Sequence, residues 1–540
     1  MKPVITLLLS LTTCGLSAQW STDPAAPMVI APAGGVPDNL VAFGDGAGGW
    51  FAFWKDKRTD GQNYEVYGQR LDADGHALWE PDGRLIHHED TGAVREFTAG
   101  MMGDGNVLLV TIGALSGTYD TLRAIALDME GSPIWNAPVT VTQGGPPVLT
   151  LGELALVPTS DGAVIGWYDI YFGGASGINV ARITASGDLL WEPDGHAIPG
   201  ATYGPFNLLP DGADGVLVHW RDGNGIGAGY HAMRVDSSGA NAWPANVQTN
   251  AGSTGFNGNH KMVAAEDASM RLAYVNTAYK VQLVAMDTTG ALLFNPSPVP
   301  VCNYASNQGQ VSMVQEDGIT TVVWGDSRPP ASSHDVYMQR FDAAGNALLD
   351  TNGVLVMHLN TYIPTTGLVP SLNGSVIATI DGNVDGLSAM RMNADGTPAW
   401  PGPVAFCTPI DNPSYHRQYQ FPDGAGGIVS IWLTLQNTRI LGAKIFANGT
   451  LGGGVGLAER DRPALLHAYP NPATTRLFLD AGAEGVLGNV TLMNATGSLV
   501  HAMHGQGTRA EVDVQHLAPG LYLLRSEYNG TVATARFMKQ

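Results

Sequence analysis

A short pattern returns along most of this chain at intervals of just over fifty residues. It is a polar turn with a central glycine, followed by apolar residues that often end in an aromatic side chain, as in DADGHALW around Gly75. The other seven glycines are Gly131, Gly187, Gly239, Gly290, Gly345, Gly396 and Gly449, so successive units are 51 to 56 residues apart. So narrow a spread over eight units predicts a repeat architecture, in which each unit packs against its neighbours.

Two more landmarks keep the same phase and indicate what each unit contains. A turn such as Asp-Gly precedes an apolar segment that ends in tryptophan, at Trp54, Trp167, Trp220, Trp324 and Trp432. A segment of alternating polar and apolar residues, such as YEVYGQRLD at 64–72, precedes the glycine landmark. Alternation is the period of a β-strand, and Asp-Gly and Asn-Gly supply the positive φ that tight hairpins need. Each unit is therefore expected to form about four short antiparallel strands.

The fold class follows from how such units can bury their faces. A single four-stranded sheet cannot cover both of its faces, whereas sheets stacked radially cover one another. The composition agrees, since 69 Gly and 33 Pro supply turns, 44% of the residues are apolar and only 14% are charged. We predict an all-β chain in which residues 19–460 form a β-propeller of about eight four-stranded blades, with seven blades and an irregular closing unit as the alternative. The five tryptophans are expected to pack between blades; stacking on a ligand is the less favoured role.

Residues 1–18 are predicted to be a signal peptide. Lys2 provides the positive start, the apolar run Val4–Leu11 is too short to span a bilayer, and the cut is expected after Ala18. Leu16 is large for its place in the cleavage motif, so the cut could shift by a residue or so. Cys14 leaves a lipoprotein signal as an alternative.

Cys302 and Cys407 are the cysteines that remain after the signal peptide. They end equivalent segments in repeats two units apart, farther apart than a disulfide can bridge. Both are expected to be buried free thiols.

The chain has a formal net charge of −21, and this charge lies in the repeat region because residues 461–540 contain six acidic and six basic residues. An acidic surface repels nucleic acid and anionic lipid, and it favours solubility or divalent cations. Nucleic acid is therefore not expected as a partner.

Candidate site residues are few. The turns with Asp72, Asp74, Asp211 and Asp214 could ligate Ca²⁺ through carboxylate oxygens, although turn geometry alone also explains them. The pairs Asp56–Arg58 and Asp326–Arg328 suit an ion pair of the repeat better than a site. The sequence has no HExxH zinc motif and no GxSxG nucleophile motif, so no catalytic or cofactor-binding residue can be named and the chain is expected not to be an enzyme.

The repeat pattern ends at about residue 460. Residues 461–540 are predicted to form six or seven short strands in a small immunoglobulin-like β-sandwich. The segments YPNPA, NATGSLV, LAPGLYLL and the terminal RFMKQ resemble the type A (Por) C-terminal sorting domain of type IX secretion substrates. The motif residues are Tyr469, Pro470, Asn471, Pro472, Gly497, Gly520, Tyr522 and Lys539. An ordinary immunoglobulin-like binding module is the alternative.

These resemblances imply a compartment more than an activity. The repeat, with Trp54, Asp56 and Arg58 in its first unit, resembles modules common in large secreted proteins of the Bacteroidota. The sorting domain implies contact with the type IX secretion machinery, passage through the outer membrane, and release or attachment at the cell surface.

We therefore expect a secreted or cell-surface protein, most simply a monomer, that binds or adheres to a glycan or protein without catalysis. A polysaccharide hydrolase or lyase with its site at the mouth of the propeller is the alternative, and a structural role in the cell envelope is the third possibility.

Overall fold

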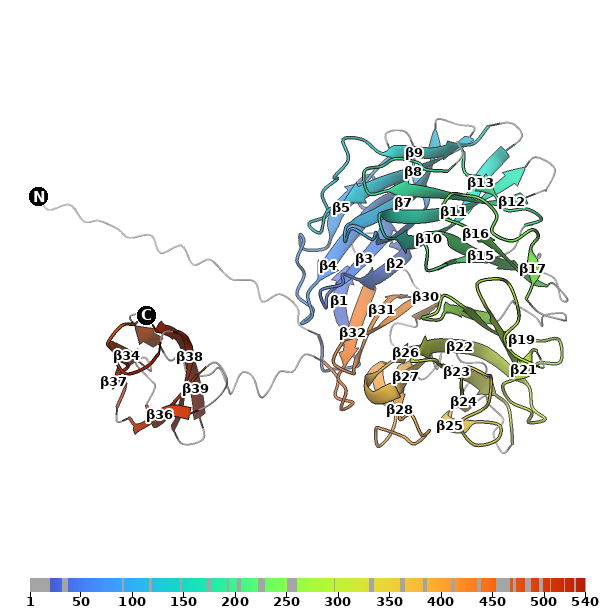
Figure 1. Ribbon diagram of the computed structural model, residues 1–540. Coiled ribbons are helices and arrows are strands. Elements are labelled where there is room, and N and C mark those ends of the chain that lie inside the picture. The colour runs from blue at the N-terminus through green and yellow to red at the C-terminus, as the bar shows by residue number, and fades with distance from the viewer. Residues whose placement is uncertain are drawn as a thin grey trace, which may run out of the picture. The chain divides into compact units, whose positions relative to one another are not determined.

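A computed structural model shows two compact units, residues 1–453 and 454–540, which are described separately (Figure 1). The structure describes residues 20–31, 37–89, 92–115, 119–145, 148–171, 176–191, 194–201, 205–221, 229–249, 260–295, 297–329, 335–359, 365–381, 386–408, 413–434, 439–452, 467–469, 473–480, 487–494, 499–505, 507–518, 520–528 and 531–539. The predicted signal peptide, residues 1–18, lies outside them. No helix of the described part is long and apolar enough to cross a membrane.

The first unit consists of eight four-stranded antiparallel sheets, and seven of them are built from consecutive strands. Blade 1 is β2 (Asp38–Gly44), β3 (Trp50–Asp56), β4 (Glu65–Leu71) and β5 (Arg84–His87); blade 2 is β6 (Val94–Met101), β7 (Val107–Leu115), β8 (Tyr119–Leu127) and β9 (Val139–Gln143). Blade 3 is β10 (Val148–Thr159), β11 (Gly162–Tyr171), β12 (Ser176–Thr184) and β13 (His196–Ala197); blade 4 is β14 (Phe206–Pro210), β15 (Val216–Arg221), β16 (Tyr230–Val235) and β17 (Val247–Gln248). Blade 5 is β18 (His260–Ala264), β19 (Met270–Val275), β20 (Val281–Met286) and β21 (Val299–Pro300); blade 6 is β22 (Gln308–Glu316), β23 (Ile319–Asp326), β24 (Asp335–Phe341) and β25 (Val354–Met357). Blade 7 is β26 (Thr365–Pro370), β27 (Val376–Asp381), β28 (Leu387–Met392) and β29 (Val404–Cys407), with the 3-10 turn η2 (Leu372–Gly374) between its first two strands.

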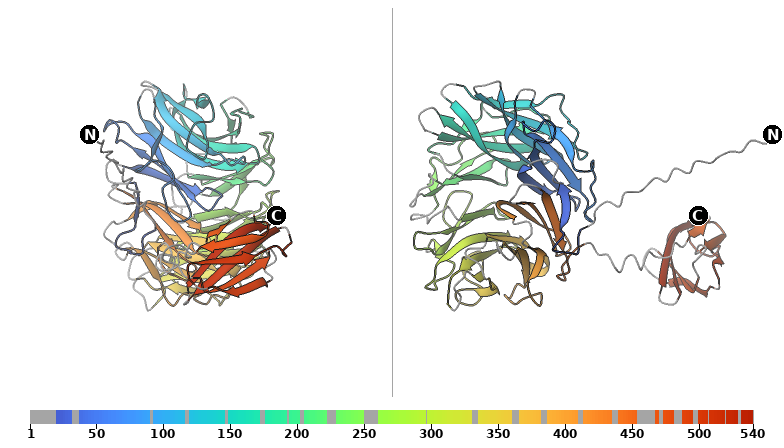
Figure 2. Two further views of the ribbon diagram at one scale, coloured as in Figure 1. Left: turned by 90° about the vertical axis from the view of Figure 1, so that its left-hand side faces the viewer. Right: turned by 180° about the vertical axis from the view of Figure 1, so that it is seen from behind.

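The eighth sheet joins the two ends of the unit. It consists of β30 (Pro413–Pro422), β31 (Ile428–Thr434), β32 (Ile440–Ile445) and the N-terminal strand β1 (Met28–Ala31), which pairs with β32. In Figure 2 the blue N-terminal strand lies beside the orange strands of this last blade. The first strand of each blade contacts the first strand of the next, from β2 through to β30 and back to β2. The predicted propeller of eight blades is confirmed.

The apolar core lies between blades, as radial stacking requires. One hydrophobic cluster combines side chains of blades 3, 4 and 5, and another combines blades 6, 7 and 8. The five strand-ending tryptophans are completely buried, which confirms packing as their role. In several blades the turn before the fourth strand passes very close to the indole. At Gly83, whose φ is +89°, a Cβ atom would overlap the ring of Trp54.

The glycine landmark marks a contact between blades at the outer rim. The residue four places after the glycine packs its side chain against the glycine of the following blade, where a Cβ would meet the ring. Trp79, for example, packs on Gly131, and its Nε1 donates to the carbonyl of Met129 at 3.2 Å. The same indole-to-carbonyl bond recurs from Trp135, Trp191, Trp243 and Trp400. Phe294 and Leu349 make the packing contact without a donor.

The cysteine prediction is confirmed: Cys302 and Cys407 are buried free thiols. Cys302 follows β21, the outermost strand of blade 5, and Cys407 ends β29, the outermost strand of blade 7.

The second unit contains two antiparallel sheets. One has the order β33 (His467–Tyr469), β34 (Arg476–Asp480), β37 (Arg509–Asp513), and the other the order β36 (Leu499–His504), β35 (Asn489–Asn494), β38 (Gly520–Tyr528), β39 (Thr531–Lys539). Side chains of both sheets share one hydrophobic cluster, which includes Leu477, Leu492 and Phe537. The predicted strands are present, whereas the immunoglobulin likeness of their arrangement stays a prediction.

Packing between blades can be measured at one buried tryptophan. We expect Trp220→Ala to lower the free energy of unfolding of the full chain by about 3–5 kcal/mol, because it removes a fully buried indole from the core of blades 3 to 5. Leu78→Ala is the control, since Leu78 is 49% exposed and its loss should change stability by no more than about 0.5 kcal/mol. Equal urea-unfolding midpoints for the two variants would contradict the interblade position of Trp220.

Candidate functional site

The predicted pair Asp56–Arg58 belongs to a small cluster of polar contacts in blade 1. Trp54 donates its Nε1–H to the Asp56 carboxylate at 3.4 Å, and the Arg58 Nε donates to the same carboxylate at 2.8 Å. The guanidinium lies 4.3 Å from the ring centroid of Tyr67 and donates to the carbonyl of Asp82 at 2.7 Å. The pair therefore ties the second strand to the third and to the turn that follows.

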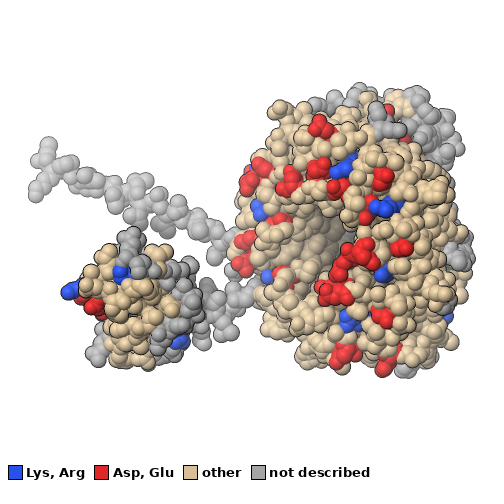
Figure 3. All heavy atoms as spheres, viewed as in Figure 1, with Lys and Arg blue, Asp and Glu red and all other residues tan. Residues whose placement is uncertain are grey.

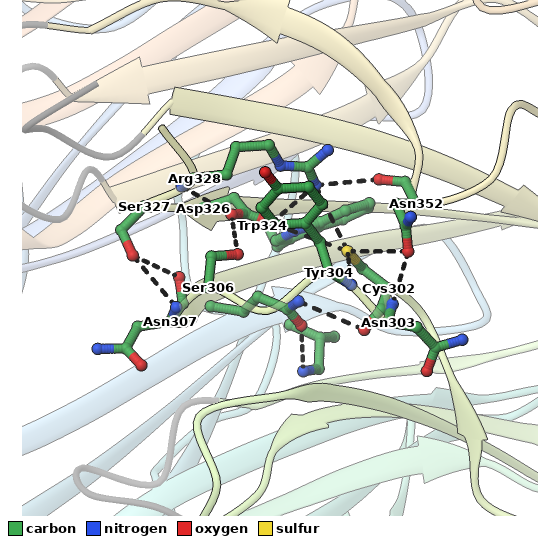
Figure 4. A network of polar contacts seen from close by, with 12 residues as sticks. Cys302, Asn303, Tyr304, Ser306, Asn307, Trp324, Asp326, Ser327, Arg328 and Asn352 are labelled. Carbon is green, nitrogen blue, oxygen red and sulfur yellow. Dashed lines mark hydrogen bonds and ion pairs between the residues drawn. The ribbon is translucent and has the colours of Figure 1, made fainter. Parts of the chain in front are cut away.

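The pair Asp326–Arg328 forms an equivalent cluster of polar contacts in blade 6 (Figure 4). Trp324 donates to Asp326 at 3.1 Å, and Arg328 donates to Asp326 at 2.8 Å while stacking 3.6 Å from the ring centroid of Tyr337. Recurrence of one geometry in two blades favours a role in blade architecture over a role in a site.

The segment that connects β21 of blade 5 to β22 of blade 6 adds a buried thiol to this cluster. The Arg328 Nη2 lies 3.4 Å from the Cys302 Sγ, and Ser306 donates to Asp326. Burial raises the pKa of Asp326, but hydrogen bonds from Arg328, Ser306 and Trp324 outweigh burial and hold that pKa below its ordinary value. Burial also raises the pKa of the Cys302 thiol, so the sulfur stays protonated and is a poor nucleophile.

The calcium candidates of blade 1 are engaged in their own turn. The Asp72 carboxylate accepts the backbone N–H groups of Asp74 and His76, both at 2.9 Å, and its second oxygen lies 2.9 Å from the His76 Nδ1. These bonds lower the pKa of Asp72, although burial opposes them. Asp74 belongs to the same turn.

The candidates of blade 4 serve a hairpin and a neighbouring blade. Asp211 accepts the backbone N–H groups of Ala213 and Gly215 and pairs with Arg234 at 3.0 Å. Asp214 accepts the backbone N–H of Ser160, in blade 3, at 2.7 Å. The structure therefore keeps the two pairs of candidates in separate blades. In the described part of the chain no three His, Cys, Asp or Glu side chains are grouped as a metal site would require.

A different set of polar groups lies where the blades meet around the axis. Figure 3 shows a hollow in the face of the body that it views, and the innermost strands surround it in Figure 1. Glu96 on β6 and Glu153 on β10 come from neighbouring innermost strands and keep contact with solvent. We call these two side chains the inner carboxylates.

Irregular strands position these groups. The ladder of blade 1 shifts between Asp38 and Leu40, and that of blade 3 shifts between Gly152 and Leu154. The extra residues at these bulges, which have no register partner on the next strand, are Asn39, with φ 51°, and Glu153, with φ 37°. A bulge re-aims the side chain of the extra residue relative to the regular strand.

The inner carboxylates are joined to the blades on either side. The Asn39 Nδ2 donates to the Glu96 Oε1 at 2.7 Å, and the backbone N–H of Phe206 donates to the Glu153 carboxylate. Four successive innermost strands, β2, β6, β10 and β14, thus contribute to one row of polar groups.

Electrostatics raise the pKa of one acid in this row. Partial enclosure by the blades and the negative charge of Glu96 together raise the pKa of Glu153, although this residue keeps contact with solvent. A carboxyl group with a raised pKa can exchange hydrogen bonds with hydroxyl groups, or hold and donate a proton. Sequence reasoning missed this row. The one available signal is an acidic residue near the start of two successive first strands, in REFTAG and GELALV.

A second concave surface lies on the outer rim between blades 3 and 4. Its volume is about 560 Å³, and Leu190, Trp191, His196, Ser238, Gly239 and Ala240 line it. The Trp191 indole already donates to the carbonyl of Ser237 and packs on Gly239, so this depression belongs to the rim contact.

The predicted sorting motif is spread over the second unit. Tyr469 ends β33, while Pro470, Asn471, Pro472 and Gly497 lie outside the described residues. Gly520 and Lys539 are register partners on β38 and β39, and Tyr522 is buried with its hydroxyl donating to the carbonyl of Ala518 at 2.9 Å.

Comparison with known proteins identifies the second unit. Residues 467–540 match the model of the secretion system C-terminal sorting domain. No curated protein matches the chain.

Several solved structures are similar at low identity. The GH93 α-L-arabinofuranosidase of Fusarium graminearum is 10% identical over 78% of this chain and 96% of its own, with a TM-score of 0.32. The β-propeller domain of the Trilobed protease from Pyrococcus furiosus is 8% identical over 67% of this chain and 94% of its own, with a TM-score of 0.34. The polysaccharide lyase Uly1 is 10% identical over 57% of this chain and 78% of its own, with a TM-score of 0.37. Similarity at this level assigns no activity to the chain.

The resemblance noted in the sequence is therefore confirmed for the C-terminal unit. The sorting domain implies a source among the Bacteroidota and a place outside the cell or on its surface. The chain is a β-propeller protein that carries a type IX secretion sorting domain.

Proposed function

We propose that the propeller binds an extracellular glycan at the hollow around its axis, without cleaving it, after export by type IX secretion. The observation that carries this proposal is the row Asn39, Glu96, Glu153 and the Phe206 backbone, which runs across four innermost strands. Ligand sites are concave surfaces with a few fixed polar groups, and a ring of rigid blades supplies both.

A glycan suits this row better than the other ligands we considered. Carboxylate oxygens accept hydrogen bonds from adjacent hydroxyl groups, and charged acceptors make the stronger bonds. The net charge of −21 disfavours nucleic acid and anionic lipid. Binding to a protein rather than a glycan is an outcome that the same experiment detects.

The binding proposal predicts a defined loss of affinity. A glycan array followed by calorimetry should give saturable binding to the full chain, and Glu153→Gln and Glu96→Gln should each weaken it about 10-fold or more, because each loses a charged acceptor worth about 1.5 kcal/mol. Glu130→Gln is the control, since Glu130 is an exposed acid on the rim. Unchanged affinity in the inner variants would place the ligand elsewhere, and silence on broad glycan panels with saturable binding on a protein panel would replace the glycan by a protein.

Cleavage of a polysaccharide is the second candidate, and one observation favours it. The pKa of Glu153 is raised beside Glu96, which is the pattern expected when one acid donates a proton and the other acts as base or nucleophile. We expect no release of reducing or unsaturated ends when the full chain is incubated with polysaccharides that it binds. Release of such ends, lost about 100-fold or more in Glu153→Gln and Glu96→Gln but kept in Glu130→Gln, would establish the enzyme instead.

Export has its own prediction, which concerns the contact of the second unit with the type IX machinery. A chain that ends at Gly453 should accumulate in the periplasm, whereas the full chain should be found on the cell surface or in the medium by fractionation and immunoblot. Residues 454–540 fused to an unrelated periplasmic protein should carry it outside. Surface delivery of the shortened chain would contradict the role of this unit in sorting.

A further inference from the structure

The rim contact is incomplete at one of the eight joints. In seven blades the residue four places after the landmark glycine packs on the next blade. In blade 8 that place falls on Gly453, which has no side chain. The partner at this joint, Gly75 of blade 1, is nevertheless covered, and the ring that covers it belongs to Trp20. We call the joint between blades 8 and 1 the seam.

Trp20 reproduces the contact that Trp79 and its counterparts make elsewhere. Its Nε1 donates to the carbonyl of Ala73 at 3.2 Å, as the other indoles donate to the equivalent carbonyl of the next turn. Its backbone N–H donates to the carbonyl of Asp74 at 3.4 Å, and its ring meets Trp50 edge to face at 5.8 Å. The side chain is only 2% exposed.

The residues after Trp20 first contact the end of blade 7, just after β29, and then pair with the edge of blade 8. The carbonyl of Pro24 accepts the backbone N–H of Thr408 at 2.9 Å. Met28, Ile30 and Ala31 are buried, and β1 supplies the outermost strand beside β32, opposite Gly442, Leu441 and Ile440. Without this segment, β32 would present an unpaired edge.

We infer that residues 20–31 form a latch: a peptide that binds without covalent help in a groove between blades 8 and 1 and supplies the aromatic residue that blade 8 lacks. The recognition combines strand addition to the edge of β32 with one buried indole anchor. The occupant of this groove is the N-terminal segment of this chain, and the groove accepts the same segment when it is supplied as a separate peptide.

The latch sets a limit on the removal of the signal peptide. Trp20 follows the predicted cut after Ala18 by two residues, so a cut on the far side of Trp20 would remove the indole from the seam. The mature chain therefore has to retain Trp20.

An exchange of residues across the seam tests the inference. Trp20→Ala should lower the melting temperature of the full chain by about 5 °C, as expected for loss of a buried indole from a large unit. Adding Gly453→Trp to that variant should restore at least half of the loss, because residue 453 follows Gly449 by the same four places by which Trp400 follows Gly396. Gly453→Trp alone is the control, and it should not raise the melting temperature, because Trp20 already covers Gly75. Absence of a shift in Trp20→Ala, or absence of any rescue, would overturn the latch.

A peptide experiment tests binding in the groove directly. A chain lacking residues 19–31 is titrated with a synthetic peptide of residues 19–31, and its melting temperature should rise with a saturable dependence on peptide concentration. The Trp20→Ala peptide should bind about 10-fold more weakly or worse. If the shortened chain does not fold alone, refolding with the peptide present should recover it. No effect of the peptide in either format would overturn the inference, and since neither experiment involves a glycan, its failure leaves the proposed function untouched.

Discussion

The packing of one side chain on the glycine of the next blade is the contact on which the ring depends. Each joint buries a side chain over a residue that has no Cβ, and the indole also donates to a backbone carbonyl. A cation from the third strand reaches the same turn, as Arg70 does at the carbonyl of Met129 and Arg391 at that of Ala447. Where blade 6 has Leu349 and no indole, Arg340 still donates to the carbonyl of Ala394. The joints therefore share the packing contact although their polar contacts differ, and together they close the ring of blades.

The acidic character of the body serves this same architecture. Asp45 and Asp211 each fix a hairpin through backbone N–H groups and hold the arginine that reaches the next blade. The carboxylates of these two Asp-Gly turns are thus engaged in hydrogen bonds and ion pairs within the propeller. Glu96 and Glu153 differ from these acids, because no described ion pair involves them. Carboxylates outside the described ion pairs are the better candidates for contact with a ligand.

What the sequence could predict divides along the repeat. Features that recur every fifty-odd residues, such as Trp54 and Gly75, predicted the blades, their number and the packing of the tryptophans. Trp20 occurs once, outside the period, and its function became visible only when the ring brought it to Gly75. The inner row could not be predicted for another reason. Asn39 and Glu153 have positive φ at bulges, and no motif in the sequence indicates this conformation there. Recurrence thus predicts architecture, whereas the candidate site consists of departures from it.

The seam also explains why blade 8 differs from the others. A Cβ on Gly452 would meet Ser21 and Thr22, so the start of the mature segment and the end of the last blade lie against each other. A bulky residue at position 452 would compete with the latch for the same space. Side chains within residues 20–452 make the rim contact at all eight joints. Shortening the chain to residues 20–452 should therefore keep the rim contacts of the ring.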